Sequence, residues 1–137
     1  MADTPEISAV ISCYFEEKTI EEFHARLSAA LKATKRPYEI IFVNDGSTDK
    51  TFEKLKGIFE KDPQVSVIMD LFKNAGQAAA VTAGLCEARG RIILSMDSDL
   101  QLDPEDLPSL LAEFDKGNDV VSGFRRKRKD SFFRILP

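Results

Sequence analysis

Residues 38–61, YEIIFVNDGSTDKTFEKLKGIFEK, change from an apolar run to a helical pattern within a few positions. The run from Tyr38 to Val43 is short, apolar and rich in β-branched and aromatic side chains, which predicts a buried strand. From Thr48 to Lys61, apolar side chains recur at helical spacing, which predicts an amphipathic helix. The residues between the two segments are those that a turn favours. The stretch therefore predicts a strand, a turn and a helix in succession.

The same alternation continues on both sides of this unit. Further strands are predicted at Ile7–Cys13, Val65–Met69, Ile92–Met96 and Asp119–Ser122, and further helices at Thr19–Ala33, at Ala75–Ala88 and from Pro104 to Gly117. Gly90 is predicted to form a left-handed cap after the third helix. The order βαβαβαβαβ predicts an α/β fold, a doubly wound and mostly parallel sheet with helices on both faces.

Composition and charge limit the protein classes that fit. The chain has 137 residues, 43% of them hydrophobic, which fits one domain with a core. A net charge of −4 argues against nucleic acid as a partner, because phosphate binding needs an excess of Lys and Arg. The two cysteines have no zinc or disulfide spacing and are expected to be reduced and buried. Without an apolar run of about 18 residues, the chain is expected to be a cytoplasmic domain.

Polar residues follow several of the predicted strands, at the edge where open parallel sheets bind ligands. Tyr14, Glu16 and Glu17 follow the first strand, residues 44–49 follow the second, and Asp97-Ser98-Asp99 follows the fourth. Carboxylates that converge on one edge repel each other unless a cation or a ligand's hydrogen-bond donors lie between them. The pattern therefore predicts a site for a divalent metal or a polar ligand.

A structural alternative exists for each of these clusters. Residues 44–49 can be a turn that leads into a helix N-cap, and the two glutamates can be first-turn acids. The i, i+2 spacing of Asp97 and Asp99 puts both carboxylates on one side of a strand end, which favours the metal or ligand interpretation. The small residues at 73–77 permit close approach of a ligand, or simply tight helix packing. The basic run at 125–129 fits a phosphate clamp or a solvated stretch.

Taken together, these segments resemble family 2 glycosyltransferases of the GT-A fold, in the branch that loads sugars onto dolichyl or polyprenyl phosphate. The segments that carry the resemblance are Glu39–Asp49, Asn74–Gln77 with Ala80, Ala83 and Gly84, Asp97–Gln101 with Pro104, Glu105 and Pro108, and Asp119–Val121 with Gly123, Arg125 and Arg128. They cover nearly the whole chain in the order expected. The joint match is much more specific than a lone D-x-D.

The resemblance implies a metal-dependent, inverting glycosyltransferase that uses a UDP- or GDP-sugar and passes the sugar to a polyprenyl or dolichyl phosphate. It implies Mg²⁺ or Mn²⁺ as the cofactor. The resemblance implies that the nucleotide sugar contacts Tyr14, Glu16, Asp45, Gly76, Gln77, Asp97 and Ser98. It implies that Asp99 and Gln101 hold the metal and that Arg125 and Arg128 bind the acceptor phosphate. The catalytic residues that it implies are Asp97, Asp99 and Arg125.

The chain departs from the family pattern in three respects. Its first strand ends in Ser12-Cys13-Tyr14-Phe15-Glu16, where Pro-x-Tyr-Asn-Glu is usual, and Asn44 replaces the first of two aspartates after the second strand. The resemblance implies an acceptor-side half after the fifth strand, often followed by membrane helices, and the 137 residues are expected to stop short of both. Residues 1–123 are thus expected to form the nucleotide-sugar-binding domain, and 124–137 to lead into an acceptor-side or membrane-proximal region.

Two other functions remain as alternatives. One is a module that binds a nucleotide sugar without turnover. The other is a D-x-D phosphohydrolase, which is disfavoured because Gln101 stands where that chemistry needs Thr or Val. The full-length protein is expected at the cytoplasmic face of a membrane, and a homo-oligomer is one arrangement left open.

Overall fold

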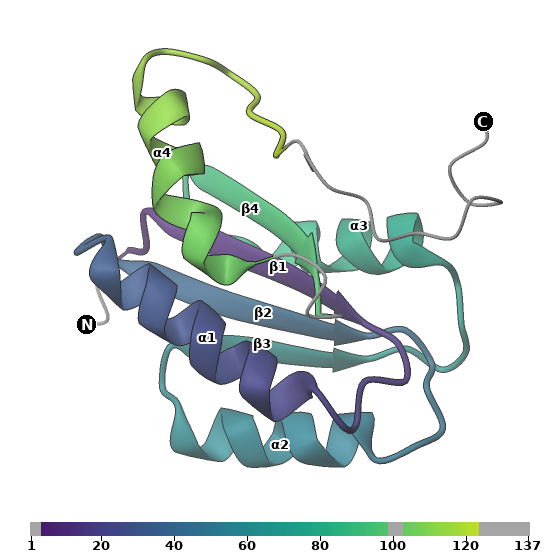
Figure 1. Ribbon diagram of the computed structural model, residues 1–137. Helices are drawn as coiled ribbons and strands as arrows, with labels where there is room; N and C mark the ends of the chain where they lie inside the picture. Colours follow the sequence, from purple (N-terminus) through teal and green to yellow (C-terminus); the bar gives the residue numbers. More distant parts are fainter. Residues whose placement is uncertain (1–3, 99–102, 124–137) are drawn as a thin grey trace, which may run out of the picture.

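The computed structural model of the protein, shown in Figure 1, describes residues 4–98 and 103–123. Its four strands are β1 (Ile7–Cys13), β2 (Tyr38–Asn44), β3 (Val65–Asp70) and β4 (Ile92–Asp97). Its helices are α1 (Ile20–Ala33), α2 (Thr51–Lys61), α3 (Gln77–Glu87), the 3₁₀ turn η1 (Pro104–Asp106) and α4 (Leu107–Asp115). The predicted site residues Asp99, Gln101, Arg125 and Arg128 lie outside the described residues.

The strands form one sheet in the order β3-β2-β1-β4, and every pair is parallel. Their carboxyl ends therefore meet at one edge, which lies to the right in Figure 1. β1 and β2 are buried along their whole length, as expected for strands covered on both faces. The parallel α/β sheet predicted from the sequence is confirmed.

Alternate residues of β1 and β2 enter two separate hydrophobic clusters. Ile7, Ala9 and Ile11 pack in the larger cluster, together with apolar side chains of α1, α2 and α4. Val10 of β1 instead belongs to a smaller cluster with Ala80 of α3. This two-residue alternation places α3 on one face of the sheet and the other three helices on the opposite face, as Figure 1 shows.

The predicted fifth strand at 119–122 is wrong. Residues 119–123 have no strand structure, and Val120 is 85% exposed. A strand of this length needs a neighbouring strand and a face to bury, and the described sheet ends at β4 without reaching this segment. The boundary predicted at residue 123 stays a prediction.

Three smaller corrections concern the helices and the cysteines. α2 begins at Thr51 instead of Thr48. α3 ends in an extended Ala88, and Gly90 is not among the residues with positive φ, so it does not form the expected left-handed cap. Gly117 does have that conformation, with φ 102°, at the end of α4. Cys13 is buried as expected, whereas Cys86 is exposed.

None of the helices within 4–98 and 103–123 has the length and apolar character needed to span a membrane.

Candidate functional site

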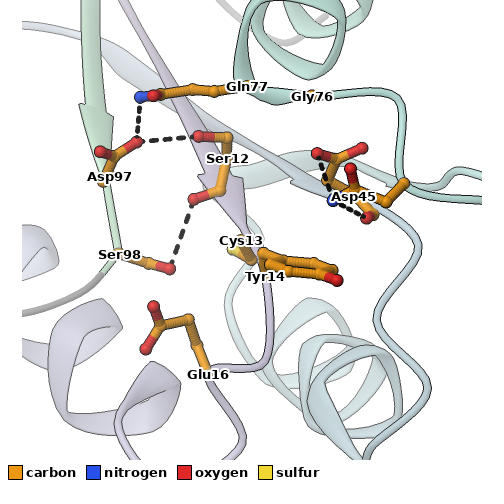
Figure 2. Close-up of a pocket in the computed structure, with 10 residues that line it drawn as sticks. Ser12, Cys13, Tyr14, Glu16, Asp45, Gly76, Gln77, Asp97 and Ser98 are labelled. Atoms are coloured by element: carbon orange, nitrogen blue, oxygen red, sulfur yellow. Dashed lines mark hydrogen bonds between the residues drawn. The ribbon is translucent and has the colours of Figure 1, made fainter.

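A polar cavity of about 240 Å³ opens at the carboxyl edge of the sheet, and Figure 2 shows the side chains around it. It brings together seven of the residues predicted to bind the donor, namely Tyr14, Glu16, Asp45, Gly76, Gln77, Asp97 and Ser98. Ser12, Cys13 and Asn74 complete its lining. The cavity therefore gathers residues from the ends of β1, β2 and β4 and from the start of α3.

Asp97 is held by side chains from two other elements. The register of β1 and β4 pairs Ser12 with Asp97, and the Ser12 hydroxyl donates to Asp97 Oδ1 at 3.0 Å. Gln77, the first residue of α3, donates its amide N–H to the same oxygen. Next along the chain, the buried Ser98 hydroxyl donates to the Ser12 carbonyl at 3.4 Å. These contacts fix the carboxylate while leaving Oδ2 without a hydrogen bond from the described residues.

Asp45 is buried beneath the loop that joins β3 to α3. Its Oδ1 accepts the Ala75 backbone N–H at 2.8 Å, and its Oδ2 accepts the Asn74 side-chain amide at 3.2 Å. Gly46 makes this close approach possible, since a Cβ there would lie 2.3 Å from the backbone nitrogen of Asn74. Gly46 also has φ +74°, a conformation that glycine adopts without strain. The Asp-Gly pair thus joins two of the loops around the cavity.

The turn at 44–49 contributes Asp45 to the cavity and also leads into helix α2. Lys50 is the N-cap residue of α2, and Asp49 Oδ1 accepts both the backbone N–H and the hydroxyl of Thr51, at 3.0 and 2.6 Å. Asn44 is fully buried and donates its amide to Asp70 Oδ1 at 2.8 Å. A carboxylate at position 44 would repel Asp70, which gives a physical reason for asparagine here.

The two glutamates after β1 precede α1, so they are not first-turn acids of that helix. Glu16 lines the cavity, and its carboxylate accepts the Thr19 hydroxyl at 2.7 Å. Glu17 instead accepts the backbone N–H of Lys50 at 3.1 Å and ties the β1–α1 loop to the start of α2. Only the first of the pair therefore belongs to the site.

The segment 99–102 is flanked by anchored residues on both sides. On the far side, the Arg26 guanidinium of α1 binds Glu105 with two hydrogen bonds, at 2.9 and 2.7 Å, and Asp103 at 3.1 Å. Hydrogen bonds from this guanidinium lower the pKa of Glu105 to about 2. On the near side, Ser98 is hydrogen-bonded to β1 as described above.

Carboxylates dominate the electrostatics of the cavity. Glu16, Asp45 and Asp97 line it, and none of its ten lining residues is Lys or Arg. Burial raises the pKa of Cys13 to about 12, so this thiol stays neutral and is no nucleophile. An anionic ligand such as a diphosphate can enter this site only with cations that offset the carboxylates.

The oxygen ligands of the cavity suit a hard divalent cation. Asp97 offers Oδ2, and carboxylate oxygen is a preferred ligand of Mg²⁺ and Mn²⁺. Within the described residues no group of three or more His, Cys, Asp or Glu side chains is placed to hold a metal. A metal would therefore take further ligands from its substrate and from Asp99 and Gln101, the predicted metal ligands that fall in segment 99–102. The chemistry of the residues fits the ion on these terms.

Three lining residues were absent from the predicted site, namely Ser12, Cys13 and Asn74. Ser12 and Cys13 belong to the strand end that departs from the family pattern, and β1 is a central strand whose end faces the same edge as Asp97. The strand register, Ser12 beside Asp97 and Cys13 beside Asn44, is the signal that places them. Asn74 belongs to a segment that the sequence did single out for close approach.

An open parallel sheet with a polar cavity at its carboxyl edge is the arrangement in which open α/β proteins bind their ligands. Residues 8–137 match the family described as Glycosyl transferase family 2, and the chain belongs to that family. Among curated relatives, an undecaprenyl-phosphate 4-deoxy-4-formamido-L-arabinose transferase of Pseudomonas fluorescens is 39% identical over 131 residues. A dodecaprenyl-phosphate galacturonate synthase of Rhizobium johnstonii is 38% identical over 134 residues. Each alignment covers 96% of this chain, and the relatives belong to the polyprenyl-phosphate branch that the sequence resembles.

Solved structures agree with a GT-A fold. The mannosyltransferase PcManGT from Pyrobaculum calidifontis, in complex with GDP-Man and Mn²⁺, superposes with a TM-score of 0.63 at 22% identity, covering 78% of this chain and 31% of that one. TarS from S. aureus, in complex with UDP-GlcNAc, gives a TM-score of 0.60 at 26% identity, covering 81% and 31%. The chain spans only 39% and 40% of the lengths of the two curated relatives above.

Proposed function

We propose that the cavity binds the nucleotide part of a UDP- or GDP-sugar and that the protein takes part in transferring the sugar, with inversion, to a polyprenyl phosphate. The observation that carries the proposal is the convergence of Tyr14, Asp45 and Asp97 on one cavity at the carboxyl edge. Family membership and the names of the two curated relatives support it.

The described residues divide between the base, the ribose and the diphosphate. Tyr14 offers an aromatic face to the base, and about half of its surface is open for that contact. Asp45 is an acceptor for base or ribose donors, while Asn74 and Ala75 keep its carboxylate in place. Gly76 has no Cβ, so the backbone before α3 can approach the ligand closely. Gln77, Glu16 and Ser98 complete the polar wall.

The proposed cofactor is Mg²⁺ or Mn²⁺, with Asp97, Asp99 and Gln101 as the residues that would hold it. When bound, such an ion neutralises charge on the departing nucleoside diphosphate. The acidity of the cavity supports this proposal, because a diphosphate beside three carboxylates needs that compensation. A PcManGT complex with Mn²⁺ is consistent with a divalent ion in this fold.

The proposed acceptor is a lipid phosphate, and Arg125 and Arg128 are proposed to bind it. A phosphate is already ionised at neutral pH, so no residue of the chain has to remove a proton from it. Its oxygen forms a bond to the anomeric carbon while the bond from that carbon to the diphosphate breaks, and the configuration inverts. We place the full-length protein at the cytoplasmic face of a membrane, where a polyprenyl phosphate is available.

The test is a transfer assay with labelled UDP- and GDP-sugars, Mn²⁺ and detergent-dispersed polyprenyl phosphate. The expected product is a labelled polyprenyl phosphate sugar with the anomeric configuration opposite to that of the donor. Asp99→Ala is expected to abolish the product, and Glu60→Gln, on the exposed end of α2, is expected to leave it unchanged. A retained configuration would refute the inverting mechanism.

A second candidate is a donor-binding module that performs no transfer in isolation. The specific observation in its favour is that the chain spans about two fifths of the length of the curated relatives. Donor binding without a labelled lipid product would select this candidate. Transfer by the 137-residue chain would eliminate it.

A further inference from the structure

Phe15 has a backbone conformation that is rare for a large side chain. Its φ is +52°, and among the described residues only Lys35, with φ +58°, is another non-glycine residue with positive φ. A bulky residue in the left-handed region is strained, whereas asparagine tolerates it much better. The strain costs about 1 kcal/mol or more, and such residues concentrate at functional sites.

Burial of the Phe15 side chain does not account for this conformation. The residue is 48% exposed and belongs to neither hydrophobic cluster. Its place in the chain is more informative, since it stands between Tyr14 and Glu16, which both line the cavity. Phe15 itself is not a lining residue. Any effect of Phe15 on the cavity must therefore pass through a neighbouring residue.

That neighbour is Tyr14. The two rings meet edge to face, with centroids 4.6 Å apart and an interplanar angle of 74°. This is one of the favoured geometries of an aromatic pair, worth about 0.5–1.5 kcal/mol beyond its buried area. Tyr14 is 49% exposed, and Figure 2 shows its ring beside the cavity. Without Phe15, an exposed tyrosine ring can rotate and has to be ordered when a ligand binds.

We propose that Phe15 is a positioning residue that fixes the ring plane of Tyr14 as a platform for the base of the donor nucleotide. The inference rests on the proposed function, and it adds a residue that determines donor affinity. A platform that is already oriented avoids the cost of ordering a side chain on binding. The strained backbone of Phe15 is the cost of keeping an aromatic ring at this turn.

Phe15→Asn separates strain from function, because asparagine removes the ring and fits the backbone. We expect this variant to melt at the same temperature as the wild type or higher, and to bind UDP or GDP with Mn²⁺ about three- to tenfold more weakly. Lys35→Asn is the matched control, because it also places asparagine at a residue with positive φ. Lys35 is exposed, follows α1 and does not line the cavity. The melting temperature of Lys35→Asn should also hold or rise, with an unchanged Kd. Phe15→Tyr should retain the wild-type Kd.

A spectroscopic readout tests ring orientation directly. The chain has two tyrosines and no tryptophan. Tyr38 is buried, and its hydroxyl has no hydrogen-bond partner among the described residues, so Tyr38→Phe should be well tolerated. In that background Tyr14 is the remaining tyrosine, and its near-UV circular dichroism reports a fixed ring. Adding Phe15→Asn should abolish most of this signal before any nucleotide is present.

The outcomes for the inference and for the proposed function are distinct. If Phe15→Asn binds the nucleotide as tightly as wild type, or keeps the dichroism of Tyr14, the positioning role is wrong while donor binding stands. A melting temperature several degrees below wild type would make Phe15 a structural residue and would also refute the proposal. If the wild type binds no nucleotide or nucleotide sugar with Mn²⁺, the proposed function itself fails.

Discussion

Glu39 is a buried carboxylate at the amino end of β2, far along the strand from the cavity. Only 2% of its surface is exposed. Its oxygens accept hydrogen bonds from the Ser8 and Ser66 hydroxyls, both at 2.7 Å, and from the Arg89 backbone N–H at 2.8 Å, with Arg89 Nη2 at 3.1 Å. One side chain thereby joins β1, β2, β3 and the segment before β4. Burial by itself raises the pKa of Glu39, but these hydrogen bonds outweigh it and lower the pKa below the ordinary value.

Glu39→Gln is predicted to lower the free energy of unfolding by about 1–3 kcal/mol at pH 7, because charge-assisted hydrogen bonds are lost in a buried site. A carboxylate with a lowered folded-state pKa stabilises the fold above its unfolded pKa, and this stability is lost as the pH falls through the folded value. The difference between wild type and variant should therefore shrink as the pH falls below about 4.5. Urea unfolding of both proteins at pH 7 and at successively lower pH measures this difference in the free energy of unfolding.

The control for this prediction is Glu60→Gln, which changes an exposed glutamate in α2 and should alter stability by less than about 0.5 kcal/mol. A wild-type-like stability of Glu39→Gln at pH 7 would contradict the structural role of this carboxylate.

Single residues of the site were predictable where a polar side chain directly follows an apolar run. Asp97 directly follows Met96, Asp45 stands one residue beyond the end of its apolar run, and both line the cavity. Ser12 was not predicted because a serine within an apolar strand looks like a core position. The left-handed backbone of Phe15 was beyond reach too, since phenylalanine is the type of residue that this conformation disfavours.

At the scale of elements, α3 packs closely against the sheet at Gly84. Gly84 faces β1 and β2, and a Cβ there would come within 2.5 Å of Val10 Cγ1 and 3.1 Å of Val43 Cγ2. The small residues of this helix thus serve tight packing, while its first residue, Gln77, reaches Asp97. Tight packing is confirmed at Gly84 of the helix, whereas close approach of a ligand at 73–77 stays a prediction.

Gly84→Ala is predicted to destabilise the protein by about 1–3 kcal/mol, because overpacking moves α3 away from the sheet. The same change at Gly57, in the interior of α2, meets nothing within 4 Å and should stabilise by about 0.5–1 kcal/mol through helix propensity. Chemical denaturation measures the change in the free energy of unfolding of each variant. If the packing is right, this change is negative for Gly84→Ala and positive for Gly57→Ala. A stabilising Gly84→Ala would show that α3 lies further from β1.

The elements that the sequence predicted correctly share a strong local signal. Apolar runs at 7–13, 38–43, 65–69 and 92–96 became strands β1 to β4, because each has a neighbouring strand and an apolar face to bury. The run at 119–122 has comparable residues but no neighbouring strand in the described sheet. Pairing is a property of the tertiary structure, and a local pattern does not contain it.

At the scale of the whole molecule, the described residues form a carboxyl edge with a polar cavity, and the chain spans about two fifths of the length of its curated relatives. The sheet order β3-β2-β1-β4 places the last described strand, β4, at one side of the described sheet, while the segment 103–106 is anchored to Arg26 of α1. The fold and most of the cavity followed from the sequence, because strand order and polar strand ends suffice to build this edge. The identity of the donor sugar and nucleotide did not follow from the sequence, since it depends on contacts that only a bound ligand would reveal.

The most direct test of the central claim, that this cavity binds a nucleotide sugar, is isothermal titration of UDP- and GDP-sugars into the 137-residue chain with and without Mn²⁺. Asp97→Asn keeps the Oδ1 that accepts from Ser12 and Gln77 and replaces only Oδ2, which accepts no hydrogen bond from residues 4–98 and 103–123, so its fold should be unchanged. We predict Mn²⁺-dependent binding to wild type, weakened at least about tenfold in Asp97→Asn. Equal affinity of the two proteins, or no binding of either sugar nucleotide to wild type, would contradict the claim.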